Sequence, residues 1–190
     1  MRQKKCGTQT AARIITASGA KIFAMTELEN LARQLGNALL ARGELLTAAE
    51  SCTGGWLAQS VTAIAGSSNW FERGFVTYSN AAKVEMLGVP ETTLERHGAV
   101  SEATARAMAQ GALSHSRAHW SVAITGIAGP GGGSAEKPVG TVCFAWAAKD
   151  GGCEAEIRCF GGDRAAVREQ SVRHALQGLL VRLDEQPMLA

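Results

Sequence analysis

Three candidate nucleophiles and a glycine pair stand where an apolar run gives way to a helical pattern. They are, in order, Ser51, Cys52, Thr53, Gly54 and Gly55. Residues 45–49 have the pattern of a short buried strand, and residues 56–64 have helical apolar spacing. Backbone N–H groups at such a helix start can hold an anion or the oxyanion that develops during acyl transfer. The junction therefore indicates a site for nucleophilic chemistry.

Each residue at this junction also has a structural interpretation. A serine at a strand-to-helix junction is more often an N-cap than a nucleophile. Cys52 is intrinsically the better nucleophile, yet a free cysteine is commonly a small buried apolar residue. Glu50 can orient the loop with its carboxylate instead of taking part in the chemistry. The junction by itself leaves these alternatives open.

A second loop, residues 125–138, follows the apolar run 120–125 and contains five glycines. Glycine lets a backbone approach a ligand closely. The loop is neither a Walker loop nor a dinucleotide fingerprint, because neither pattern occurs in it. Composition alone is equally consistent with a flexible surface connection. Thr125 at the strand end and Lys137 near the exit favour an anion or sugar site.

Helical and strand patterns alternate along the chain. The predicted helices are 26–42, 54–65, 80–87 with Asn80 as its cap, one that starts at Ser101, and 164–184. The predicted strands are 45–50, 74–78, 120–125, 139–147 and 154–160. A turn at 150–152 joins the last two strands into a hairpin. The sequence therefore predicts an α/β fold, a three-layer α/β/α sandwich with a mixed central sheet.

Composition limits the class of protein. With 190 residues, 46% of them hydrophobic and 19% charged, the chain has the size and balance of one compact domain. The five cysteines are scattered and odd in number, which favours neither a disulfide framework nor a zinc site. We therefore expect a reducing, cytoplasmic setting and no metal.

The positive charge is concentrated at the N-terminus. Five of the 19 basic residues and none of the 17 acidic ones lie in residues 1–24, which leaves residues 25–190 with a net charge of −3. We interpret 1–24 as a disordered extension or an upstream-start artefact, and 25–190 as a single domain starting at Met25. The acidic body argues against nucleic acid as a partner, and no apolar run is long enough to span a membrane.

Six segments together carry a family resemblance. They are 49–55 (AESCTGG), 74–80 (GFVTYSN), Lys83, 97–101 (HGAVS), 125–130 (TGIAGP) and 137–142 (KPVGTV). In this order, over about residues 26–182, they resemble the CinA carboxy-terminal domain family. Longer members carry a preceding molybdopterin-binding-like domain, which this chain is too short to contain. Stand-alone members include amidases that convert nicotinamide mononucleotide to nicotinic acid mononucleotide and ammonia.

The resemblance implies a Ser-Lys pair, with Ser51 as nucleophile and Lys83 as its base. A lysine can act as a base near neutral pH only if burial or a neighbouring cation lowers its pKa, so we predict a buried Lys83 amine. Tyr78 is expected to end the preceding strand and to bond Lys83 or relay a proton. The backbone amides of residues 52–54 (Cys52, Thr53 and Gly54) are the candidate oxyanion hole.

The nucleotide part of such a substrate needs its own contacts. Thr125 and the glycines after it, Gly126 and Gly129, are expected to meet ribose or phosphate together with Lys137. Arg164 supplies a guanidinium whose fork suits phosphate, although a surface ion pair is an equal alternative. Asp163 is the expected N-cap of the last helix.

The sequence thus favours a cofactor-free, metal-independent amidase whose partner is a small pyridine mononucleotide. The rival hypotheses are a nucleotide-binding regulatory module without catalysis and an amidase for a different amide. Family members often associate, so we expect a homo-oligomer. Trp56, Trp70 and Phe71 are candidates for its interface, although they suit a core equally well.

Overall fold

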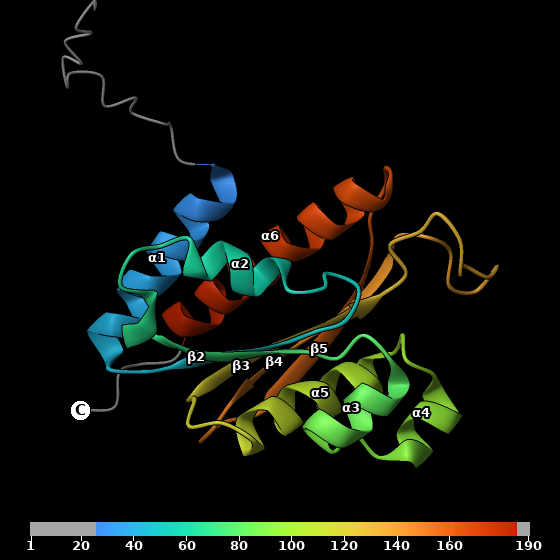
Figure 1. The fold of residues 1–190 in the computed structure, drawn as a ribbon, viewed down its shortest axis with the longest axis horizontal. Helices are drawn as coiled ribbons and strands as arrows, with labels where there is room; N and C mark the ends of the chain where they lie inside the picture. The colour runs from blue at the N-terminus through green and yellow to red at the C-terminus, as the bar shows by residue number, and fades with distance from the viewer. Residues whose placement is uncertain (1–25, 186–190) are drawn as a thin grey trace, which may run out of the picture.

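A five-stranded sheet covered by helices on both faces makes up the computed structural model (Figure 1). The structure describes residues 26–185, so the interpretation of residues 1–24 and of Met25 as the start lies outside the described part. The helices are α1 (Glu27–Arg42), α2 (Trp56–Thr62), α3 (Asn80–Leu87), α4 (Glu91–His97), α5 (Glu102–Ser114) and α6 (Arg164–Glu185). The strands are β1 (Leu46–Glu50), β2 (Phe71–Val76), β3 (Trp120–Gly126), β4 (Thr141–Ala148) and β5 (Cys153–Cys159).

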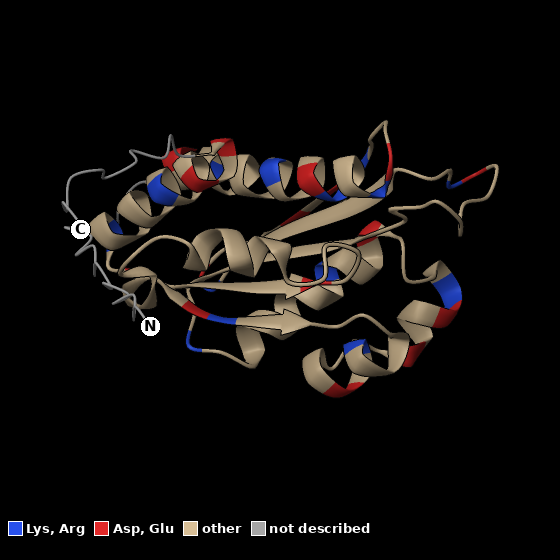
Figure 2. Ribbon diagram, turned by 45° about the horizontal axis from the view of Figure 1, so that its top comes forward, with Lys and Arg blue, Asp and Glu red and all other residues tan. Residues whose placement is uncertain are grey.

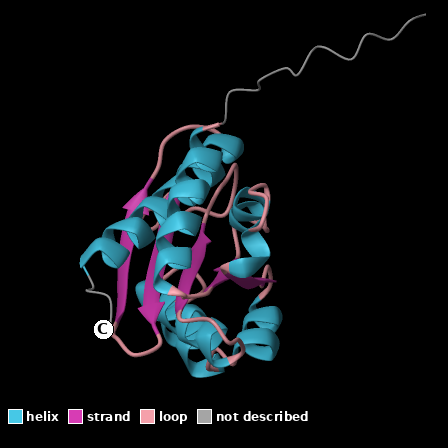
Figure 3. Cartoon of the chain, turned by 90° about the vertical axis from the view of Figure 1, so that its left-hand side faces the viewer, coloured by secondary structure: helices cyan, strands magenta, loops and turns pink. Residues whose placement is uncertain are grey.

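The sheet has the strand order β2-β1-β3-β4-β5. Strands β2 and β3 pair with β1 in parallel, whereas β4 and β5 are antiparallel to their neighbours. Helices α1, α2 and α6 cover one face and α3, α4 and α5 the other (Figure 1). Figure 3 shows the strands of the sheet in magenta beside the helices in cyan. The predicted three-layer sandwich with a mixed sheet is therefore confirmed.

Alternation along the central strands divides the core into two halves. On β4, Val142, Phe144 and Trp146 pack on the side of α1 and α6. Cys143 and Ala145, between them in sequence, pack on the side of α5. Side chains alternate between the two faces of a strand, so a strand covered on both faces is apolar throughout. This explains why the run 141–148 carries no polar alternation.

Several helix ends lie where the sequence predicted them. Thr26 caps α1 in a reciprocal capping box with Glu29, and Gly43 ends that helix in the left-handed conformation. Ser101 caps α5, and Asp163 accepts a hydrogen bond from the Ala166 amide at the start of α6.

The prediction was wrong around the second strand. Strand β2 begins at Phe71 and ends at Val76, so Tyr78 lies beyond it. The cap of α3 is Ser79, whose hydroxyl accepts from the amide of Ala82, and Asn80 is the first helical residue. Adjacent serine and asparagine are equally good caps, so the pattern does not distinguish them. Helix α4 was missed because it is short and has no fully buried residue.

The surface is mixed in charge, and its aromatic residues are largely covered. Trp70 is 1% exposed and belongs to the core, while Trp56 and Phe71 are partly buried and pack against the core. Basic and acidic residues both lie on the outer helices (Figure 2). Within residues 26–185, every helix is too short or too polar to cross a membrane.

Gly140 ties the glycine-rich loop to the end of β5. Its amide donates to Ile127 O at 2.8 Å, and its carbonyl accepts from the amide of Phe160 at 2.9 Å. The residue has φ = 97°, and a Cβ there would lie 2.0 Å from Phe160 O. Only glycine fits, because a side chain would meet both backbone strain and a backbone oxygen.

We predict that Gly140→Ala lowers the free energy of unfolding by about 3 kcal/mol or more, through strain and the forced displacement of Phe160. Urea titration followed by circular dichroism measures this change. Gly152→Ala is the matched control, since a Cβ at Gly152 meets nothing within 4 Å. Equal stability of the two variants would contradict the prediction.

Candidate active site

The candidate nucleophile lies on a tight turn that leaves the end of β1. The Ser51 amide donates to Ile124 O of β3 at 2.9 Å, which continues the parallel pairing one residue past the strand. Gly54 and Gly55 then have φ values of 59° and 93°, so the chain reverses into α2 with two left-handed residues. The glycine pair seen in the sequence is what permits this turn.

Glu50 holds the turn from inside. Its carboxylate is buried and accepts hydrogen bonds from the amides of Gly55, Leu57 and Ala58 at 2.8–3.0 Å. These N–H groups belong to the first turn of α2, where intrahelical partners are missing and the helix dipole favours an anion. The interpretation of Glu50 as the residue that orients the loop is therefore confirmed.

Lys83 meets Ser51 in the interior. Its Nζ lies 3.1 Å from Ser51 Oγ and 2.9 Å from the carbonyl oxygen of Thr77. Lys83 is 1% exposed and Ser51 is 8% exposed, so the pair is nearly closed to solvent. The predicted buried amine is confirmed. Residues 32 positions apart are brought together because β1 and β2 are adjacent and parallel, and both end at this edge of the sheet.

Burial lowers the pKa of Lys83 below its ordinary value, against a smaller opposing effect of Cys52. A neutral amine has two N–H donors and one lone pair. One N–H can donate to Thr77 O, which leaves the lone pair free to accept the Ser51 hydroxyl proton. The Ser51–Lys83 contact therefore has the geometry of a nucleophile and its base.

Cys52 is a poor rival for Ser51. Its side chain is buried, and desolvation raises the pKa of its thiol to about 12. Because the thiolate is the reactive form, such a thiol is inert near neutral pH. Of the three candidate nucleophiles, only Ser51 lies against a base among the described residues.

The amides of the turn differ in whether they are available. The Gly54 amide donates to Ser51 O at 3.1 Å, and the Gly55 amide is held by Glu50. Among the described residues, no oxygen accepts a hydrogen bond from the amides of Cys52 and Thr53, and the Cys52 amide interacts with its own thiol. Of the three amides expected to form the oxyanion hole, that of Gly54 already donates to Ser51 O, so those of Cys52 and Thr53 remain as the candidates. Thr53 Oγ1 is also buried and unpaired within residues 26–185.

Tyr78 pairs with Arg164 instead of Lys83. Its side chain is 61% exposed, and Arg164 Nη2 donates to its hydroxyl at 2.9 Å. Arg164 Nη1 donates to Gly129 O at 2.8 Å. The expected Tyr78–Lys83 bond is absent from the described contacts, because the chain leaves β2 at Val76 and Tyr78 faces outward. Arg164 thus links the loops that carry Tyr78 and Gly129 to the start of α6.

The other residues expected to contact a nucleotide bond the protein itself. Thr125 is fully buried, and its hydroxyl donates to Ala99 O at 2.8 Å. Lys137 Nζ donates to the carbonyls of His97 and Val100 at 3.1 and 2.7 Å. Gly126 lies in β3, where a Cβ would come within 2.7 Å of Thr141 O. In the structure, Thr125 and Lys137 attach the glycine-rich loop to the segment before α5, whereas Gly126 packs against β4.

Two groups at the site were missed from sequence. The Thr77 carbonyl, a partner of Lys83, carries no sequence signal because any residue has one. Arg168 of α6 donates to the Thr53 carbonyl at 2.7 Å. It lies four residues after Arg164, so both arginines occupy one face of the first turns of α6, and this spacing is a signal that could have been used.

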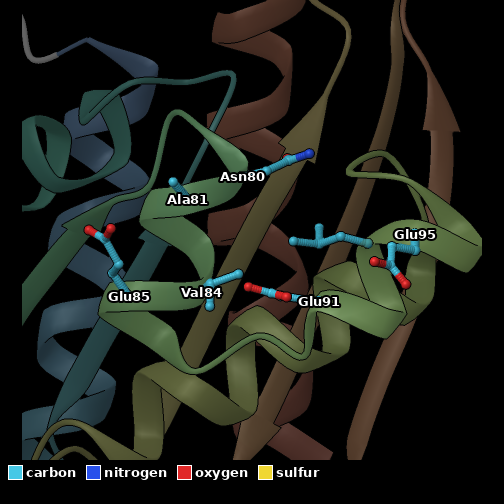
Figure 4. Close-up of a pocket in the computed structure, with 7 residues that line it drawn as sticks. Asn80, Ala81, Val84, Glu85, Glu91 and Glu95 are labelled. Atoms are coloured by element: carbon cyan, nitrogen blue, oxygen red, sulfur yellow. The ribbon is translucent and has the colours of Figure 1, made fainter.

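A cavity of about 430 Å³ lies between α3 and α4 (Figure 4). Three acidic residues, Glu85, Glu91 and Glu95, are among those that line it. Neither Ser51 nor Lys83 lines it, because Lys83 points from α3 into the protein. The cavity is therefore separate from the Ser51–Lys83 pair.

Comparison with known proteins places this geometry in a family. The model of the CinA C-terminal domain matches residues 28–183, which is nearly the whole described chain. The chain belongs to the CinA C-terminal domain family. The expected resemblance is thereby confirmed, and the Ser51 turn, Lys83 and the glycine-rich loop all lie inside this CinA domain.

Relatives of this CinA domain include named enzymes. It is 60% identical over 154 residues to nicotinamide-nucleotide amidohydrolase PncC of Escherichia coli, a match that covers 81% of this chain and 93% of that protein. It is 51% identical to the protein of the same name from Pseudomonas putida, with 82% and 97% covered. A crystal structure of competence/damage inducible protein CihA from Agrobacterium tumefaciens superposes with a TM-score of 0.81 at 48% identity, covering 85% of this chain and 98% of that one.

We predict that Lys83→Met raises the melting temperature by about 3 °C at pH 6, because it removes an amine that burial disfavours in its charged form. Between the lowered pKa of folded Lys83 and the ordinary lysine value, the unfolded wild type binds more protons than the folded one. Wild-type stability therefore rises with pH in that window, and the difference shrinks toward pH 10.

Differential scanning calorimetry from pH 6 to 10 measures this difference. The control is Lys149→Met at an exposed turn, which should gain nothing that depends on pH. A pH-independent gain for Lys83→Met would show that the buried charge is not its cause.

Proposed function

We propose that this protein is a nicotinamide-nucleotide amidase, which hydrolyses the carboxamide of nicotinamide mononucleotide to nicotinic acid mononucleotide and ammonia. The observation that carries the proposal is the buried contact of 3.1 Å between Lys83 Nζ and Ser51 Oγ, beside two backbone amides from which no oxygen within residues 26–185 accepts a hydrogen bond. The names and full-length similarity of the bacterial amidohydrolases support the choice of substrate.

In the first half of the proposed reaction, the neutral Lys83 amine takes the hydroxyl proton of Ser51 as Oγ attacks the carboxamide carbon. The carbonyl π electrons move onto oxygen, and the amides of Cys52 and Thr53 bind the resulting oxyanion. When the intermediate collapses, the C–N bond breaks. The Lys83 ammonium returns its proton to the departing nitrogen, which leaves as ammonia.

The second half uses the same groups in reverse roles. Lys83 is again neutral and takes a proton from a water molecule, whose oxygen attacks the acyl-Ser51 ester. The oxyanion forms at the same two amides, and the ester C–O bond breaks. The proton returns to Ser51 Oγ, and nicotinic acid mononucleotide is released. All steps use acid-base groups of the chain, so we expect activity without a metal or cofactor.

For the nucleotide part, Arg164 is the best-placed cation. It is exposed, and both of its described partners, the Tyr78 hydroxyl and the Gly129 carbonyl, are neutral. A phosphate would offer the guanidinium a charge-assisted, bidentate partner in their place. Thr125, Gly126 and Lys137 act on this site by holding the glycine-rich loop. Tyr78 acts at the mouth of the site through Arg164.

The two rival hypotheses differ from this proposal in what they require of the site. A regulatory nucleotide-binding module would need no buried lysine against a serine, and burying an amine in this way is costly. An amidase for another amide would use the same Ser51 and Lys83 and differ in the contacts of Arg164.

We further propose a homo-oligomer acting in the cytoplasm on a small-molecule substrate, without nucleic acid. Sedimentation velocity tests the oligomeric state.

We predict that wild type and Cys52→Ala release ammonia from nicotinamide mononucleotide in the presence of EDTA, whereas Ser51→Ala and Lys83→Ala lose at least about 1,000-fold in kcat. Ammonia is measured by a coupled assay and the product by chromatography. Retained ligand affinity in Ser51→Ala supports an enzyme. If no variant makes ammonia while the ligand still binds, the regulatory module replaces this proposal.

The pH profile provides a second test. Because the base must be neutral, kcat/KM should rise with pH. The midpoint of this rise is set by the pKa of Lys83, which burial holds below the ordinary lysine value. Cys52→Ala should keep the midpoint at or below that of wild type, since the only effect of Cys52 on the pKa of Lys83 is to raise it. A midpoint at or above the ordinary lysine value would exclude Lys83 as the base.

A further inference from the structure

Arg168 reaches from α6 across to the turn that carries Ser51. Its Nη2 donates to the carbonyl oxygen of Thr53 at 2.7 Å, over 115 positions of sequence. Its guanidinium carbon lies 5.1 Å from the ring centroid of Trp56, the first residue of α2. The arginine is half-buried, and its Nε is enclosed without a hydrogen-bond partner among residues 26–185. These contacts attach one guanidinium to both ends of the turn.

The contact with Thr53 acts on the backbone that must bind the oxyanion. A peptide unit is planar, so a bond that holds the Thr53 carbonyl holds the whole unit between Thr53 and Gly54. That unit is fixed on its other side by the Gly54 amide, which donates to Ser51 O. With ψ of Thr53 restrained in this way, the preceding amide of Thr53 keeps its direction relative to Ser51.

Few other described hydrogen bonds hold residues 52–54 of the turn in place. Glu50 holds the amides of Gly55, Leu57 and Ala58, all of which come after the residues that carry the free amides. The Thr53 side chain adds no bond, because its hydroxyl is unpaired within the described chain. Apart from the weak contact of the Trp56 amide at 3.3 Å, Arg168 is the described hydrogen-bond donor to the Thr53 carbonyl.

We propose that Arg168 is a positioning residue for the oxyanion hole: it sets the direction of the Thr53 amide by holding the Thr53 carbonyl and stacking on Trp56. The inference rests on the proposed function, because it takes Ser51 as the nucleophile. The role is distinct from that of Arg164, whose described partners lie in the glycine-rich loop and at Tyr78. Displacement of catalytic groups by as little as 1 Å can cost 100-fold in rate.

The first test compares Arg168→Met and Arg168→Lys by steady-state kinetics with nicotinamide mononucleotide. Methionine keeps much of the apolar stem and removes the donor, so we expect kcat to fall about 10- to 100-fold with KM within threefold of wild type. Lysine restores one donor without the planar fork, and we expect it to recover part of kcat. The midpoint of the pH profile should stay unchanged, because the contacts of Lys83 are untouched.

The matched control is Arg173→Met on the same helix. Arg173 is partly exposed and pairs with Glu27 and Glu169 on the surface. Arg173 has no described contact with the Ser51 turn, so the kcat of Arg173→Met should equal that of wild type. If Arg168→Met does not fold, the test uses Arg168→Lys and Trp56→Leu. In each of these variants the fold-decrease in kcat should exceed the fold-change in KM.

A second readout does not need the natural substrate. Diisopropyl fluorophosphate forms an Oγ–P bond with a reactive serine and releases fluoride, and the phosphoryl oxygen of the adduct requires the oxyanion donors. We expect Ser51 labelling, followed by mass spectrometry, to be about 10- to 100-fold slower in Arg168→Met and unchanged in Arg173→Met. Ser51→Ala should show no labelling.

The outcomes separate the two proposals. Labelling of Ser51 that depends on Arg168, without ammonia release by wild type, would overturn the substrate and keep the positioning role. A kcat for Arg168→Met within threefold of wild type, or a loss confined to KM, would overturn the positioning role and keep the amidase. If wild type neither reacts with the probe nor releases ammonia, both proposals fail.

Discussion

The buried contact between Lys83 and Ser51 is the interaction on which the arrangement of the site depends. An amine that is 1% exposed is held in place by a serine hydroxyl and the Thr77 carbonyl, with no carboxylate among its described hydrogen-bond partners. A carboxylate there would favour the charged amine and raise its pKa. Burial without a counter-ion does the opposite, so the same feature that weakens stability makes the lysine a usable base.

The sheet topology makes this contact possible. Parallel strands β1 and β2 end side by side, and the turn after each contributes one member of the pair. The carboxylate of the neighbouring Glu50 is directed to the other side of the turn, where it accepts hydrogen bonds from amides at the start of α2. The fold thus keeps a buried carboxylate within one residue of Ser51 while leaving the Lys83 amine free of it.

The loops around the pair are fastened mainly to one another. Arg164 links Gly129 to Tyr78, Lys137 links the glycine-rich loop to the segment before α5, and Arg168 links α6 to the Ser51 turn. Binding and catalytic groups commonly lie on loops positioned by a rigid scaffold. Here long cationic side chains that reach backbone carbonyls provide much of that positioning.

The sequence alone determined the order of the five strands and of all the α-helices except α4, together with the mixed sandwich and the Ser51–Lys83 pair. Periodicity, glycine positions and family motifs are local signals that survive in one dimension. It failed where neighbouring residues are chemically equivalent, as with Ser79 and Asn80 at the start of α3. Only the tertiary structure decided that Tyr78 turns outward to Arg164, that Gly54 is already bonded, and that Arg168 supports the Thr53 carbonyl. These outcomes depend on backbone direction and on contacts across more than 80 residues, and side-chain identity does not encode either.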